Sequence, residues 1–219
     1  MGGWQMERIQ HNGGTAGIIT AICLALLFIL FASSGLDVQT AQDPAKALPL
    51  LGQKAAVFAA TGVLGLLAAG FGLIFTFGIF ARLREKAPTR AVASLGLAFV
   101  GLTTHAFGAA LLWQGGAMLV AVSAKDQTAA AHAWIALGAV DQALMATGNA
   151  FTGAAILMAG WAIVATGVMN TTLGWVAIVA GIVEILSVFS SQTALMGLGF
   201  ILAIVWLAWG GAQLRRSPA

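Results

Sequence analysis

Charged residues are scarce in this chain, and their scarcity argues against an ordinary soluble domain. Of its 219 residues only 8% are charged, whereas 60% are hydrophobic. A soluble domain of ordinary composition carries about 25% charged residues. The mean hydropathy of +0.95 agrees with this contrast. The sequence therefore predicts an integral membrane protein, in which most side chains face lipid or other membrane-embedded helices.

Other absences limit the chemistry that the chain can carry out. The single cysteine, Cys23, excludes an internal disulfide and any zinc site built from paired cysteines. The chain has no HExxH motif, no nucleophile elbow and no phosphate-binding loop with its lysine. We therefore expect a protein that is not an enzyme, with no catalytic residue and no metal site. Tyrosine is absent as well, so an interfacial aromatic belt must rest on the seven tryptophans.

Apolar segments recur along the chain at the length of a membrane-spanning helix, about 20 residues. They predict an all-α fold, a polytopic transmembrane bundle of six helices that forms a single domain over residues 1–219. For the first span a cleavable signal peptide is the alternative, which rests on the small residues Ala32, Ser33 and Ser34. The predicted spans cover about 15–35, 55–80, 91–121, 144–168, 172–189 and 194–213.

The segment 129–170 has two interpretations, because a single helix of that length would be about twice as long as the hydrocarbon layer is thick. In one, an outer interfacial helix around 132–142 precedes the fourth span. In the other, two short spans are hinged at Thr147–Asn149. The tendency of basic residues to stay in the cytoplasm favours the first interpretation, with both termini cytoplasmic in a bacterial inner membrane. It places seven of the ten basic residues inside, namely Arg8, Arg82, Arg84, Lys86, Arg90, Arg215 and Arg216. The same placement at helix ends explains the net charge of +3, so a nucleic-acid partner is not expected.

Two rows of glycines with a seven-residue spacing indicate close contacts between helices. One row lies in the third span (Gly101, Gly108 and Gly115) and the other in the fourth (Gly153, Gly160 and Gly167). Glycine lets two backbones approach closely, and a seven-residue repeat keeps the approach on one side of the helix. The pattern predicts that the third and fourth spans pack against each other.

Polar residues inside predicted spans are the candidates for function, because they are costly to place in lipid. His105 lies between Gly101 and Gly108, and it is a candidate helix clamp, proton relay or axial ligand of a tetrapyrrole. Glu184 is the only carboxylate well inside a predicted span. We expect the two side chains to face the interior at similar depth and to satisfy each other, directly or through one water. The alternative is a protonated Glu184 with a separate hydrogen bond. Asn149 and Asp141 are further candidates near the outer interface, where Asp141 is expected to be solvated.

Two stretches carry a resemblance to a known family. They are IFARLREKAPTRAVASLG, from residue 79, and LGWVAIVAGIVEIL, from residue 173. With the order of spans, they resemble an uncharacterised bacterial family of six-helix integral membrane proteins, a domain of unknown function. The resemblance implies a six-helix fold and assigns no reaction and no functional residue.

Short connections, glycine rows and few interior charges favour a non-enzymatic membrane protein. It would act as a helix-packing accessory subunit or as a binder of an apolar ligand or lipid. Its partners would be the bilayer, other membrane subunits or a second copy of itself. The alternative is a small carrier or proton-coupled transporter that uses His105 and Glu184 as relay groups. A sealed contact between the helices favours the first function, and a water-lined cavity that reaches both residues favours the second.

Overall fold

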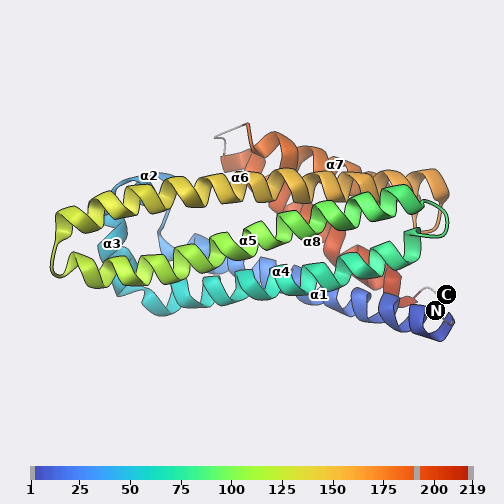
Figure 1. Cartoon of the computed structure of the whole chain (residues 1–219), viewed down its shortest axis with the longest axis horizontal. Coiled ribbons are helices and arrows are strands. Elements are labelled where there is room, and N and C mark those ends of the chain that lie inside the picture. The colour runs from blue at the N-terminus through green and yellow to red at the C-terminus, as the bar shows by residue number, and fades with distance from the viewer. Residues whose placement is uncertain (1–2, 190–192, 217–219) are drawn as a thin grey trace.

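The computed structural model describes residues 3–189 and 193–216, and within them it contains eight helices (Figure 1). The predicted all-α fold is confirmed. Six helices are long: α1 (Gly3–Ser34), α4 (Ala55–Leu83), α5 (Pro88–Ser123), α6 (Gln127–Thr166), α7 (Thr171–Ser187) and α8 (Thr193–Arg216). Two are short: α2 (Val38–Gln42) and α3 (Pro44–Gln53).

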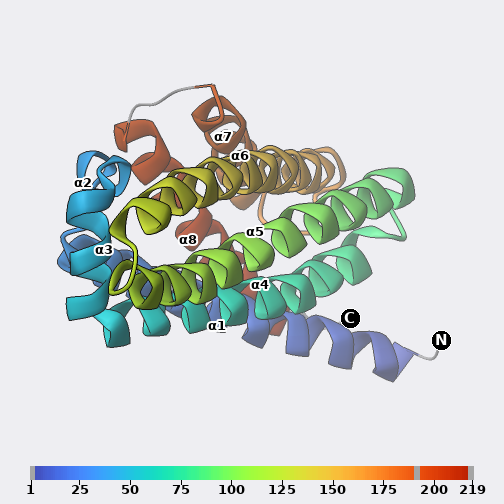
Figure 2. The same cartoon turned by 60° about the vertical axis from the view of Figure 1, so that its left-hand side comes forward.

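The six long helices form a closed ring in which each one contacts the next along the chain. The ring is completed where α8 returns to α1. The start of α1 and the end of α8 lie at one end of the bundle, with the α4–α5 and α6–α7 links (Figure 1). The α5–α6 turn and the two short helices lie at the opposite end (Figures 1 and 2).

Five of the helices are long and apolar enough to cross a membrane: α1, α4, α5, α6 and α8. By the length and composition of its helices, the chain is thus a multi-pass membrane protein. Helix α7 is equally apolar in character but has only 17 residues. Helix α1 begins well before the predicted first span, and its early part is packed rather than loose. A Cβ atom on Gly13 would lie 2.6 Å from the Cα atom of Gly78 in α4.

Helix α6 is unbroken over 40 residues, so both interpretations of this segment were wrong. Neither a separate interfacial helix around 132–142 nor a hinge at Thr147–Asn149 occurs. None of the four prolines falls between residues 89 and 217, so nothing forces an interruption. The length of about 60 Å exceeds the hydrocarbon layer. The 36-residue helix α5 lies alongside α6, and together they project beyond the other long helices (Figure 1).

The connection between α1 and α4 folds into α2 and α3, which cover the projecting end of α5 and α6. Asp37 and Asp43 cap the two short helices, and Pro44 begins α3. The Nε1 atom of Trp134 in α6 donates a hydrogen bond of 2.8 Å to the carbonyl oxygen of Ala41. The buried apolar cluster beneath this cap consists of Leu36, Ala47, Leu48, Leu51, Phe58, Ala130 and Trp134.

The larger core fills the other end of the ring, near the chain ends. Its largest fully buried members come from four helices: Ile79 and Leu83 of α4, Ile163 of α6, Leu173 of α7 and Leu214 of α8. The polar residues of interest lie between this core and the outer cap.

Candidate functional site

The site is built where α5 and α7 both pack against the middle of α6. On the α5 side, the glycine row does face α6, as the spacing predicted. A Cβ atom on Gly101 would lie 2.7 Å from Cγ2 of Thr152, and one on Gly115 would lie 2.9 Å from Cδ1 of Leu137. The hydroxyl of Ser94 adds a hydrogen bond of 2.9 Å to the carbonyl oxygen of Ala155. The two helices are therefore in close contact over much of their length.

The third and fourth spans pack against each other as predicted, but the glycine row of α6 faces a different helix. A Cβ atom on Gly153 would lie 2.8 Å from the carbonyl oxygen of Gly181, and one on Gly160 would lie 2.7 Å from that of Gly174. Both partners belong to α7. Gly167 is not a packing residue, because it ends α6 with a left-handed φ of 64°. Helix α6 is thus the central helix of the site, with α5 on one side and α7 on the other.

His105 points away from the lipid-facing side of α5. That side carries Phe107, which is 64% exposed, and Met118, which is 70% exposed. At about 100° per residue, a position two residues from Phe107 lies on nearly the opposite side of the helix. His105 is half-buried there. Its imidazole lies directly against α6, since a Cβ atom on Gly148 would come within 2.6 Å of Cε1.

Glu184 likewise points away from the exposed apolar side of its own helix, α7. Ile182 and Leu186, two residues before and after it, are both exposed apolar side chains, so Glu184 faces the opposite way, into the bundle. It is half-buried, and a Cβ atom on Gly199 of α8 would lie 3.6 Å from its Cγ. Both ionisable side chains thus face the interior of the ring, against neighbouring turns of α6.

A set of hydrogen bonds links Glu184 to α6. The hydroxyl of Thr152 lies 2.8 Å from the carbonyl oxygen of Gly148 in its own helix and donates across to Oε2 of Glu184 at 3.1 Å. The Nδ2 atom of Asn149 lies 3.4 Å from the hydroxyl of Ser187, which donates to the carbonyl oxygen of Glu184 at 2.6 Å. We call His105, Gly148, Asn149, Thr152, Glu184 and Ser187 the Thr152 cluster.

The predicted direct pair of His105 and Glu184 is not present. Within residues 3–189 and 193–216, no hydrogen bond or ion pair joins the two side chains, and the side-chain partner of Glu184 is Thr152. They approach α6 from two different helices, and α6 lies between α5 and α7. Both side chains face the interior, as predicted. The hydrogen bond to Thr152 agrees with the alternative of a separate partner for Glu184, and a bridge to His105 through one water stays a prediction.

The structure places Asp141 closer to the helix contact than expected for a solvated residue. Its Oδ1 atom would lie 3.3 Å from a Cβ atom on Gly108, and its side chain is half-buried. Asp141 and Met145 occupy the space that Gly108 leaves open on α5. Asp141 therefore lies in the α5–α6 contact, toward the outer end from the Thr152 cluster.

Sequence reasoning missed Thr152 and Ser187, although a local signal exists for both. Thr152 follows Gly148 by four residues, and Ser187 follows Glu184 by three, so in a helix each pair lies on one face. Hydroxyl side chains inside spans often bond to a carbonyl in the preceding turn, which makes them look locally satisfied. Only the position of α7 shows that Thr152 also reaches another helix.

The residues around His105 do not offer the space that a flat cofactor needs. The imidazole itself occupies the space beside Gly148, Thr152 occupies that beside Gly101, and Asp141 and Met145 occupy that beside Gly108. A tetrapyrrole at His105 therefore gains no support from the neighbouring glycines. Among the described residues, no group of three or more His, Cys, Asp or Glu side chains is arranged to hold a metal ion.

Comparisons with known proteins add no family. No protein-family model, curated protein or solved structure matches this chain.

Proposed function

We propose that this chain is a six-span protein of the bacterial cytoplasmic membrane with both termini in the cytoplasm. The proposal includes α7 as the sixth span, at about 25 Å, slightly shorter than a hydrocarbon layer of about 30 Å. The distribution of basic residues supports this orientation. Arg82, Arg84, Lys86 and Arg90 lie at or near the α4–α5 link, and Arg215 and Arg216 end α8, at the same end of the bundle (Figure 1). Membership of the bacterial six-helix family that the sequence resembles is part of this proposal.

We further propose a non-enzymatic function, as a rigid membrane subunit that packs with lipid or with other membrane helices. One observation carries it: the side chains of Thr152 and Asn149 in α6 bond to Glu184 and Ser187 in α7. The hydroxyl of Thr152 reaches Glu184, and Asn149 reaches Ser187, beside backbone contacts at Gly153 and Gly160. Interhelical hydrogen bonds and glycine contacts are the usual means of stabilising membrane bundles.

The content of the purified protein tests this function. Lipid that remains bound after detergent exchange, without a visible absorption band, is the expected result for a packing subunit or lipid binder. A visible band that His105→Leu abolishes would contradict it and would restore the tetrapyrrole interpretation. The control is His132→Leu, which removes a histidine at the outer end of α6.

A second function, a proton-coupled carrier, is favoured by the interior orientation of His105 and Glu184. His105 lies near the middle of α5 and Glu184 lies in the last turn of α7, and both are half-buried. Intramembrane ionisable groups of this kind mark proton relays in many transporters. Proton uptake into proteoliposomes with a trapped pH-sensitive dye separates the two functions. Uptake above protein-free vesicles that Glu184→Gln removes, and Glu85→Gln does not, would replace the packing function by the carrier.

A further inference from the structure

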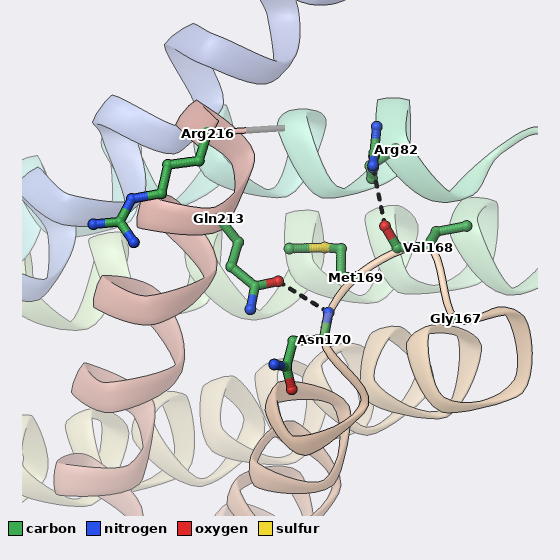
Figure 3. Close-up of a pocket in the computed structure, with 7 residues that line it drawn as sticks. All are labelled: Arg82, Gly167, Val168, Met169, Asn170, Gln213 and Arg216. Carbon is green, nitrogen blue, oxygen red and sulfur yellow. Dashed lines mark hydrogen bonds between the residues drawn. The ribbon is translucent and has the colours of Figure 1, made fainter. Parts of the chain in front are cut away.

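A cavity of about 600 Å³, shallow and wide open to the surface, lies at the end of the bundle that holds the chain ends (Figure 3). It lies between the end of α4, the link from α6 to α7 and the end of α8. Its described lining residues are Arg82, Gly167, Val168, Met169, Asn170, Gln213 and Arg216. The cavity is separate from the Thr152 cluster, with which it shares no residue.

The lining is basic and is held in place by backbone contacts. The Nε atom of Arg82 donates to the carbonyl oxygen of Val168 at 3.2 Å, which fixes this guanidinium at the rim. The Oε1 atom of Gln213 accepts from the backbone nitrogen of Asn170 at 3.0 Å, which ties α8 to the link (Figure 3). None of the seven described lining residues is acidic. Arg82 and Arg216, whose guanidinium groups point in different directions (Figure 3), give the lining a positive charge that favours an anionic group such as a phosphate.

The position along the helices places this cavity at the depth of lipid headgroups. Arg82 is the penultimate residue of α4, Arg216 is the last of α8, and Gly167 directly follows α6. Trp161 and Trp175, which are 52% and 55% exposed, lie one to two turns further into the bundle. Exposed tryptophans collect at the membrane–water interface. The guanidinium of Arg90 lies 4.4 Å from the ring centre of Trp161, as expected for a basic side chain at that level.

We propose that this cavity binds the phosphate of an anionic ligand, in the membrane the headgroup of an acidic phospholipid. Lipids and basic clusters meet on the cytoplasmic side, where anionic headgroups attract arginine. The inference deepens the proposed lipid-binding function and rests on it, and it assigns the contact to one end of the bundle. A second source of the same chemistry is free phosphate, which the experiment distinguishes.

The experiment compares lipids on the intact protein in nanodiscs or detergent. Native mass spectrometry or a competition assay would measure phosphatidylglycerol against phosphatidylcholine, with inorganic phosphate as a competitor. We expect the wild type to prefer phosphatidylglycerol. This preference should fall about tenfold in the double variant Arg82→Gln/Arg216→Gln, because each substitution removes a guanidinium group and its charge-assisted hydrogen bonds. Arg84→Gln is the matched control, because Arg84 caps α4 and is not a lining residue. Displacement of the lipid by millimolar inorganic phosphate would identify the free ion as the ligand instead.

The single variant Arg216→Gln distinguishes a loss of binding from a folding defect, because Arg216 is an exposed residue at the end of α8. It should lower the preference with an unchanged melting temperature. Equal preference in the wild type, the double variant and Arg216→Gln would overturn the site. If lipid still copurifies in that case, the proposed function stands and only its location is wrong. If no lipid binds to the wild type at all, the lipid-binding function fails together with the site.

Discussion

At the scale of single residues, the hydroxyl of Thr152 is the main link between the polar side chains of the interior. It has one proton to donate, and its two shortest contacts are the carbonyl oxygen of Gly148 at 2.8 Å and Oε2 of Glu184 at 3.1 Å. The first lies in its own helix and the second in α7. A carboxyl group in a membrane interior is costly without a hydrogen bond, so this contact stabilises Glu184 as well as the α6–α7 contact.

The first prediction concerns that contact. Thr152→Val keeps the shape of the side chain and removes the donor, so Glu184 loses the hydrogen bond from Thr152. We expect a loss of about 0.6–1.7 kcal/mol in the free energy of unfolding, the range of interhelical hydrogen bonds in membrane proteins. Thermal unfolding in a mild detergent would measure it.

Thr104→Val is the matched control for that variant. Among the described residues, the hydroxyl of Thr104 bonds to the carbonyl oxygen of Val100 alone, four residues before it in α5, so its loss should have a smaller effect. A double-mutant cycle between Thr152→Val and Glu184→Leu, which removes the acceptor, should show coupling. Additive effects, or equal losses for Thr152→Val and Thr104→Val, would mean that the contact between α6 and α7 contributes nothing.

At the scale of the helices, glycines decide which helices come into backbone contact. Helix α6 contains glycines of two kinds. Gly153 and Gly160 lie against α7 with no space for a side chain, whereas a Cβ atom on Gly138 would meet no described atom within 4 Å. Glycine is therefore required for a backbone contact at some positions of α6 and leaves open space at another.

The second prediction compares these two kinds of glycine by the same substitution. In Gly160→Ala the new Cβ atom would lie 2.7 Å from the carbonyl oxygen of Gly174 and 2.9 Å from the backbone nitrogen of Ile178, so α7 must move away. Overpacking of this kind costs about 1–3 kcal/mol. In Gly138→Ala the methyl group enters open space, and the better helix propensity of alanine adds up to about 1 kcal/mol. We expect a lower melting temperature for the first variant and an equal or higher one for the second.

A melting temperature of Gly160→Ala at or above that of the wild type would rule out a backbone contact between α6 and α7 at this point. Gly160→Leu extends the series, since it adds bulk at the same position. Its effect should exceed that of alanine.

At the scale of the whole molecule, the ring is longer on one side than on the other. Helices α5 and α6 project past α7 and α8, and the outer cap of α2 and α3 covers their projecting end (Figures 1 and 2). An isolated hairpin of that kind would expose an apolar strip to water. The cluster around Trp134 and Leu51 buries it, and Lys54 completes the junction by donating to the last carbonyl oxygens of α1, at Ser33 and Ser34.

The third prediction concerns the orientation of this ring. Single cysteines replace Lys86 in the α4–α5 link or Lys125 in the α5–α6 turn, after Cys23 has been changed to alanine. Their labelling by a membrane-impermeant maleimide in intact cells should be opposite, with Lys125→Cys labelled and Lys86→Cys protected until the cells are lysed. The positive-inside rule gives the reason, because the basic residues concentrate at the end of the bundle where Lys86 lies. Labelling of Lys86→Cys in intact cells would overturn the proposed orientation.

The sequence by itself determined the helical class, the approximate limits of most of the long helices and the interior orientation of His105 and Glu184. These depend on composition and on the period of the helix, which are local properties that a single segment carries. The glycine spacing also predicted that α5 lies closely against α6. That contact is formed by Gly101, Gly108 and Gly115.

Only the tertiary structure decided which helix faces which. The second glycine row meets α7, Glu184 is bonded to Thr152, and the segment around Thr147–Asn149 continues as one helix because α5 and the outer cap support its full length. A heptad of glycines specifies a flat side of a helix but carries no information about the partner that fills it. The partner follows from the order of the helices in the ring, where α6 lies between α5 and α7 and its two sides can serve both.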